Sequence, residues 1–187
     1  HIAQALLEKG ARLRIASRHP DKAWGLKPLA NLGQIQFVRC DVTRRDSVER
    51  AVQGAYAVVN CVGSFRGNLM RLMGQAPGWM AEAARSEGAE AFVHISAILP
   101  PDHAGNRYAE AKRAGEDRVR VAFPQATILR PSLLFGQGGG ITSLFAPLIA
   151  RFPVLPVFGA EAKVQPAYVG DVAEAAARAV AEPVKYG

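Results

Sequence analysis

Short apolar segments alternate with amphipathic ones along most of this sequence, and the alternation strongly limits the possible folds. A short alternating segment predicts a strand over 12–17, and largely apolar segments predict strands over 34–40, 55–62, 91–96 and 126–130. Periodic segments predict helices over 2–9, 46–53, 78–86, 108–121, 143–150 and 171–181. Strands that are apolar throughout are typical of a parallel sheet covered on both faces. The sequence therefore predicts an α/β fold with a doubly wound parallel sheet.

Composition excludes several other classes of protein. Of the 187 residues 21% are charged, and no apolar run approaches the roughly 20 residues of a membrane span. The net charge of +7 favours anionic partners, but the basic residues are dispersed, so we expect a phosphorylated ligand or an acidic lipid and no nucleic acid. Two cysteines, Cys40 and Cys61, lack metal-site spacing, and we expect buried free thiols in a reducing, cytoplasmic compartment.

The first helix predicted in the sequence has no capping residue before it. Ile2, Ala5 and Leu6 already follow helical spacing, and Gly10 is a helix stop. We therefore expect residues to be missing upstream of His1.

Candidate ligand-binding residues follow the strands, because a parallel sheet binds ligands at the carboxyl ends of its strands. Arg18 is basic where an acidic residue often holds a ribose hydroxyl, so it either binds a 2′-phosphate, which favours NADP(H) over NAD(H), or is a solvated surface arginine. Asp41 either accepts a hydrogen bond from an adenine amino group or caps the following turn. Gly63 lets the backbone lie against a pyrophosphate or ribose.

A possible acid–base pair follows the fourth predicted strand, which ends at Ser96. Tyr108 and Lys112 are four residues apart and therefore share one helix face. A lysine ammonium lowers the pKa of a nearby phenol, and such a pair can move a proton while a nicotinamide moves hydride. The alternative is an ordinary exposed helical pair.

The order of these segments resembles the short-chain dehydrogenase/reductase superfamily, in its extended and atypical branch of NAD-dependent epimerase/dehydratase-like proteins. The sequence is most similar to the group related to the nucleotide-binding accessory subunit of respiratory complex I. The matching segments are CDVT at 40–43, VVNCVG at 58–63, FVHIS at 92–96, YAEAK at 108–112, ILRPSLLFG at 128–136 and QPAYVGDVAEA at 165–175.

The resemblance implies a Rossmann-like fold whose first strand and glycine-rich turn are not among residues 1–187. It implies an incomplete dinucleotide-binding domain over 1–137, the start of a substrate-side region over 138–167, and a returning segment over 168–187. It also assigns residues by position: Asp41 and Val42 to adenine, Cys61, Val62 and Gly63 to the backbone along the cofactor, Tyr108 to acid–base catalysis, Lys112 to the nicotinamide ribose, Pro131 and Ser132 to the nicotinamide loop, and Tyr168 and Asp171 to support of the substrate side.

Two departures from the family pattern put turnover in doubt. Extended members usually carry more hydroxyl residues after the fifth strand of the family, where this chain reads Ser96-Ala97-Ile98. If the catalytic hydroxyl belongs after Ser96, it is lost. The usual Asn-x-x-Gly-Thr helix start is also replaced, by the sequence at 75–79.

Two main function classes follow. The first is an NADP(H)-dependent oxidoreductase or nucleotide-sugar epimerase/dehydratase, with NAD(H) as the alternative cofactor, in which Tyr108, Lys112 and Ser96 are catalytic. The second is a non-catalytic, nucleotide-bound accessory or assembly protein of a respiratory complex or quinone pathway, associated peripherally with the inner face of the membrane. A third class, an NADP(H)-sensing regulator, requires a partner that responds to the redox state of the nucleotide.

Overall fold

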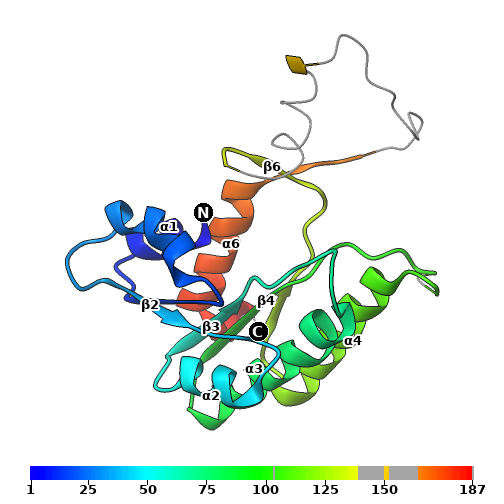
Figure 1. The fold of residues 1–187 in the computed structure, drawn as a ribbon, viewed down its shortest axis with the longest axis horizontal. Coiled ribbons are helices and arrows are strands. Elements are labelled where there is room, and N and C mark those ends of the chain that lie inside the picture. Colours follow the sequence, from blue (N-terminus) through cyan, green and yellow to red (C-terminus); the bar gives the residue numbers. More distant parts are fainter. Residues whose placement is uncertain (103, 139–149, 152–163, 187) are drawn as a thin grey trace.

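Parallel strands form the centre of the molecule (Figure 1). The structure is a computed structural model that describes residues 1–102, 104–138, 150–151 and 164–186. The predicted strands are present as β1 (Leu13–Ser17), β2 (Ile35–Arg39), β3 (Ala57–Asn60), β4 (Ala91–Ile95) and β5 (Thr127–Leu129). A further parallel pair, β6 (Leu134–Gly136) and β7 (Ala167–Tyr168), was not predicted.

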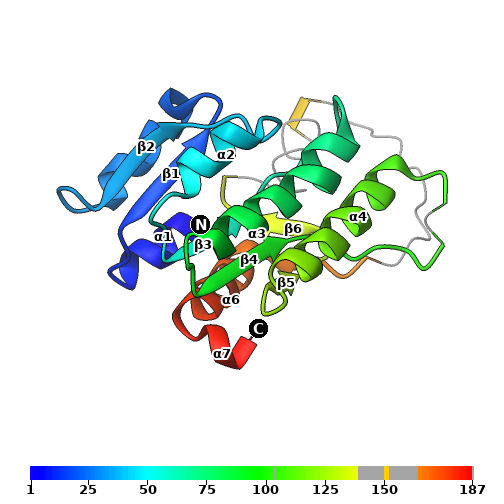
Figure 2. The same ribbon diagram turned by 90° about the horizontal axis from the view of Figure 1, so that it is seen from below.

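Helices cover both faces of these strands, as the doubly wound prediction requires (Figures 1 and 2). On one face α3 contacts both α2 and α4, and on the other α1 contacts α6. The helical segments are α1 (Ile2–Glu8), the 3-10 segment η1 (Pro20–Leu29), α2 (Arg45–Val52), the π-helical segment η2 (Met70–Gln75), α3 (Ala76–Ser86), α4 (Arg107–Ala122), α6 (Val169–Ala181) and α7 (Pro183–Tyr186).

The central strands form two separate hydrogen-bonded groups. β1 pairs with β2, and β4 pairs with β3 on one side and β5 on the other, all in parallel. Within the described residues no hydrogen-bonded pairing joins β1 to β3. The strands thus form two flanks of a parallel sheet, and the helix layers on either face connect the flanks through contacts of α2 with α3 and of α1 with α6.

Strand β4 shows why the central strands are apolar at successive positions. Phe92 is 1% exposed and packs with Phe123 of the α4 side, with ring centroids 5.9 Å apart. Its neighbour Val93 is 0% exposed and belongs to a second cluster with Ala176 and Ala179 of α6. Because successive side chains of a strand point to opposite faces, a strand between two helix layers buries both kinds of position.

For two segments the sequence leaves the structure open. It predicts a loop or a broken helix over 63–77, and the structure has a helix there from Met70, where π geometry runs directly into α3. It predicts a polar connection with at most one helical turn over 18–33, and the structure has the longer, ten-residue segment η1. The helix expected over 143–150 lies, apart from its last residue, outside the described residues. No helix within the described ranges is long and apolar enough to cross a membrane.

Candidate functional site

The residues predicted to bind a ligand lie at one edge of the strands. Ser17 of β1 is level with Arg39 of β2, and Asn60 of β3 is level with His94 of β4. Because the strands are parallel, the loops that follow them leave from the same edge. Two groups of predicted residues result along this carboxyl edge. Arg18 and Asp41 follow the pair β1 and β2, and Gly63 and Ser96 follow the pair β3 and β4.

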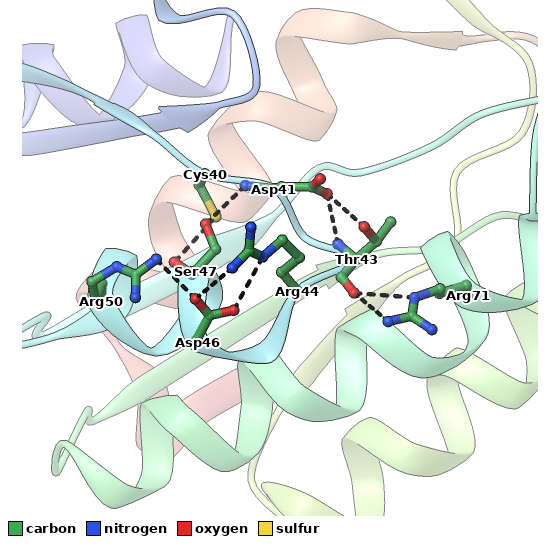
Figure 3. A network of polar contacts seen from close by, with 8 residues as sticks. All are labelled: Cys40, Asp41, Thr43, Arg44, Asp46, Ser47, Arg50 and Arg71. Carbon is green, nitrogen blue, oxygen red and sulfur yellow. Dashed lines mark hydrogen bonds and ion pairs between the residues drawn. The ribbon is translucent and has the colours of Figure 1, made fainter.

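The turn after β2 holds the Asp41 carboxylate (Figure 3). This carboxylate accepts hydrogen bonds from the Thr43 amide at 3.0 Å and the Thr43 hydroxyl at 2.8 Å, and these bonds lower the pKa of Asp41. The Asp41 amide donates to the Ser47 hydroxyl at 3.0 Å, and Arg71 donates to the Thr43 carbonyl at 2.7 and 3.0 Å. Asp41 is thus a turn-capping residue, and its contact with adenine stays a prediction.

A basic groove of about 610 Å³ lies beside this turn. Arg44 and Arg50 both bind the Asp46 carboxylate, at 3.2 and 3.1 Å (Figure 3). Neither Arg18 nor Arg39 forms an ion pair within the ranges described. The groove therefore has a surplus of positive charge suited to a phosphate. Its lining is Arg18, His19, Arg39, Asp41, Arg44, Ser47 and Arg50.

The sequence analysis identified Arg18 and Asp41 of this groove but missed the other arginines that line it. Arg39 ends β2, and Arg44 follows the Asp41 turn directly. The signal that could have found them is a cluster of arginines around the carboxyl end of a strand, on both sides of a turn-forming aspartate.

Buried Asn60 holds the backbone after β3. Its side-chain oxygen accepts a hydrogen bond from the Val62 amide at 2.9 Å, and its side-chain nitrogen contacts His94 Nδ1 at 2.9 Å. A Cβ atom on Gly63 would meet nothing within 4 Å, so this backbone is open to a ligand. The burial predicted for Cys61 is wrong: Cys61 is exposed, because it follows the last residue of β3, whereas Cys40 is buried.

Tyr108 and Lys112 lie on successive turns of α4, which Asn106 caps through a bond from the Ala109 amide at 3.1 Å. Lys112 is 3% exposed, and its ammonium donates to the Ile95 carbonyl at 2.9 Å. The half-buried Tyr108 ring stacks on Phe65, with centroids 4.8 Å apart. The expected lowering of the Tyr108 pKa is not met, because burial raises that pKa and the ammonium bonds to the backbone.

Two buried polar atoms close to Lys112 have no hydrogen-bond partner in the described part of the chain. They are the Ser96 hydroxyl and His94 Nε2, on residues that are 5% and 1% exposed. Buried polar groups in native structures are nearly always hydrogen-bonded to protein, water or ligand. The Ser96 hydroxyl, which follows β4 directly, lies near the Glu116 carboxylate and helps to lower its pKa, and the catalytic role of Ser96 stays a prediction.

An ion pair between a buried carboxylate and an exposed arginine connects α4 to the loop predicted to lie beside nicotinamide. Glu116 is 0% exposed, and Arg130 donates to its carboxylate at 2.6, 2.9 and 3.1 Å. Burial alone would raise the pKa of Glu116, but Arg130 and the nearby Ser96 hydroxyl outweigh it and the pKa is lowered. The sequence missed this pair, although Glu116 continues the four-residue spacing of Tyr108 and Lys112.

The loop after β5 is held by backbone contacts. The Pro131 carbonyl accepts a bond from the Ile98 amide at 3.2 Å, and the Ser132 hydroxyl donates to the Gln165 carbonyl. The Ser132 hydroxyl is thus engaged with the segment before β7, where Tyr168 packs on Phe135 with centroids 5.5 Å apart. The position of Pro131 and Ser132 beside nicotinamide stays a prediction.

Known proteins are similar to this chain in sequence and in fold. Ceramide reductase of Caulobacter vibrioides is 32% identical over 177 residues, which is 92% of this chain and 54% of that protein. Mitochondrial NADH dehydrogenase (ubiquinone) 1 alpha subcomplex subunit 9 of Mus musculus is 30% identical over 168 residues, 87% of this chain and 44% of that protein. The chain therefore spans about half the length of these curated relatives.

Among solved structures, the enzyme WbmH of Bordetella bronchiseptica in complex with NAD+ matches 97% of this chain and 68% of its own, with a TM-score of 0.79 and 20% identity. This likeness confirms the Rossmann-like fold. Residues 1–145 match the family model described as NAD(P)H-binding. Since that match covers well over half of the sequence, the chain belongs to the NAD(P)H-binding family.

Proposed function

We propose that this chain binds NADP(H) and forms the catalytic side of a carbonyl reductase. The observation that carries the proposal is the meeting of Lys112 and Ser96 at the end of β4. Lys112 is buried without an ion pair among the described residues, and the buried Ser96 hydroxyl beside it interacts with the Glu116 carboxylate but forms no hydrogen bond of good geometry there. Burying an ammonium in this way costs stability. Such a cost is typical of functional sites.

The residues present fit a dinucleotide laid along the carboxyl edge of the strands. Val42 and the Asp41 turn would hold adenine, and Arg18, with Arg44, would hold a 2′-phosphate in the basic groove. The open backbone at Gly63 would lie along the ribose or pyrophosphate. Lys112 would donate to the nicotinamide ribose. The bound dinucleotide would supply hydride to the substrate carbon.

The protein side of the reaction is a proton transfer from Tyr108. Because burial raises its pKa, the phenol stays protonated at neutral pH and can donate to a carbonyl oxygen that becomes a hydroxyl. The positive charge of Lys112, one helical turn away, would stabilise the phenolate left after the transfer. Ser96 would hold the same substrate oxygen. This protonation state favours reduction of a carbonyl, and the reductase among the relatives supports it.

A second function, a nucleotide-bound accessory protein, is favoured by one contact. Phe65 is 83% exposed and stacks on the Tyr108 ring, where it covers one face of the proposed acid. The likeness to a mitochondrial NADH dehydrogenase subunit supports the same alternative. In that case the cofactor would stabilise the fold, and Tyr108 would have no chemical role.

Replacing Tyr108 by phenylalanine separates these functions. The full-length protein would be incubated with NADPH and a panel of ketones, including a ceramide-type ketone because of the relative's name. Loss of NADPH absorbance measures turnover, and quenching of its fluorescence measures binding. We expect Tyr108→Phe to lose at least about a hundredfold in kcat, the usual scale of acid–base catalysis, and to keep its NADPH affinity.

The matched control is Tyr56→Phe, at an exposed tyrosine just before β3, which should keep full turnover. Equal turnover of Tyr108→Phe and wild type would exclude the proposed acid. Tight NADPH binding without turnover of any ketone by the wild type would favour the accessory function.

A further inference from the structure

The connection between β1 and β2 differs from most crossover connections because its helical segment buries no residue against the sheet. A parallel pair needs a crossover segment, which usually is a helix that buries an apolar face on the sheet. Here the crossover contains η1, a 3-10 segment without a single buried residue. It lies beside β2 and contacts α1 (Figure 2). The segment therefore contributes no buried residue to the core.

This crossover exposes large apolar side chains to solvent. Trp24 is 55% exposed, Leu29 is 47% exposed, and Leu32 is fully exposed. Leu32 stands at the tip of a turn closed by the bond from the Gln34 amide to the Asn31 carbonyl at 3.0 Å. A group of exposed apolar residues marks an interaction site more often than a single one does. We call Trp24, Leu29 and Leu32 with the lysines described next the crossover patch.

Two lysines lie among these apolar residues. Lys22 and Lys27 are exposed, and the Lys27 ammonium lies 4.5 Å from the centre of the Trp24 ring. Asp21 is the one acidic residue of the sequence 18–33, which also carries Arg18. The patch is thus both apolar and positively charged, on a chain whose net charge is +7.

The arrangement fits a fluid surface better than a preformed groove. Residues three apart share a face of a 3-10 helix, so Trp24 shares its face with Lys27, whose ammonium interrupts the apolar surface. The patch therefore lacks the continuous apolar stripe by which a helix docks into a protein groove. Tryptophan prefers the boundary between lipid headgroups and acyl chains, and lysine keeps its ammonium at the headgroups.

We propose that the crossover patch binds the surface of an anionic lipid bilayer. Trp24, Leu29 and Leu32 enter the headgroup boundary, and Lys22 and Lys27 pair with headgroup phosphates. The proposal does not depend on NADP(H) binding or on catalysis, which involve the carboxyl edge of the strands.

Sedimentation with vesicles tests the proposal on the full-length protein. We expect binding to an equal mixture of phosphatidylcholine and phosphatidylglycerol, weakened by salt, and much weaker binding to phosphatidylcholine alone. Lys22→Gln with Lys27→Gln should weaken partitioning at least about tenfold. Trp24→Ser, Leu29→Ser and Leu32→Ser combined should abolish it. NADPH affinity and thermal unfolding, measured in parallel, should stay as in the wild type for both variants.

The matched control carries Val121→Ser and Val184→Ser, at positions 81% and 99% exposed outside the patch, and should bind as the wild type does. Equal binding of neutral and anionic vesicles, or unchanged binding of the triple serine variant, would overturn the proposal. A wild type that binds neither kind of vesicle would also overturn the proposal, and a protein would then be the alternative ligand of the patch. Because NADPH affinity is measured separately, failure here is distinct from failure of the proposed function.

Discussion

The chemistry of single residues here depends on burial as much as on residue type. Lys112 and Glu116 share one face of α4, yet Glu116 is paired with Arg130 while Lys112 bonds only to a backbone carbonyl among the described groups. Desolvation lowers the pKa of Lys112. A nearby anion, such as a phenolate, would therefore interact with Lys112 more strongly than it would in water.

Arg18 is the residue on which cofactor choice should depend. We expect Arg18→Ala to raise the Kd of NADPH at least about tenfold, since a hydrogen bond to a charged group contributes about 1.5–3 kcal/mol. The Kd of NADH, which has no 2′-phosphate, should stay unchanged. Fluorescence titration with both nucleotides measures this, with Arg12→Ala before β1 as control. An equal loss for both nucleotides would contradict a 2′-phosphate role for Arg18.

His94 should make the stability of the protein depend on pH. Burial, with the neighbouring charge of Lys112, lowers its pKa from 6.5 to about 4, against an opposing effect of Glu116. Between these values the unfolded chain binds a proton that the folded chain excludes, so stability falls as pH falls from 6.5 towards 4. The loss should reach about 3 kcal/mol.

Urea unfolding at several pH values measures this effect. His94→Gln should flatten the dependence in the same window, and His19→Gln, at an exposed position, should not. A wild type equally stable at both ends of the window would show that His94 is protonated in the folded protein, contrary to its burial.

At the scale of elements, α4 is held in place by unusually close packing against η2 and α3. Pro77 has no amide hydrogen, so it cannot donate to the Met73 carbonyl as an α-helix would require. That carbonyl faces α4 at Gly115, where a Cβ atom would lie only 2.0 Å from the Met73 oxygen. Gly78 approaches Arg118 of α4 in a similar way, with a Cβ position 3.0 Å from the arginine.

Gly115→Ala should therefore push α4 away from η2. We expect a loss of about 2 kcal/mol or more in unfolding free energy, within the range of overpacked cores, and weaker catalysis because Tyr108 and Lys112 move with the helix. Gly25→Ala, where a Cβ atom meets nothing within 4 Å, should change stability by less than about 0.5 kcal/mol. Chemical denaturation compares the two. Equal stabilities would show that the helices separate at little cost.

Elements were predictable to different degrees for physical reasons. The strands from β1 to β5 and the helices α2, α3, α4 and α6 were predicted within three residues at each end, because burial on one or two faces leaves a clear period in the sequence. For η2 the sequence left a loop and a broken helix open, because Gly74 within the segment and Pro77 and Gly78 after it are typical of loops. Those residues serve the close approach to α4, which no local pattern reveals.

At the scale of the whole molecule, the proposed ligand path spans both flanks of the sheet. The basic groove lies after β1 and β2, whereas Lys112 and Ser96 lie at the end of β4. The helix layers connect these flanks, so the distance between phosphate-binding and catalytic residues depends on how α2 packs on α3 and α1 on α6. A bound dinucleotide would add a further link between the flanks.

The sequence by itself determined the fold class, the order of the strands and helices along the chain, and the candidates Arg18, Asp41, Ser96, Tyr108 and Lys112, because hydrophobic period and position after a strand are local properties. The tertiary structure alone decided which of these residues are buried, paired or free. It showed Asp41 engaged by its own turn, Lys112 bonded to Ile95, and Tyr108 under Phe65. It also brought together Asn60 with His94 and Glu116 with Arg130, since such contacts join residues far apart in the chain.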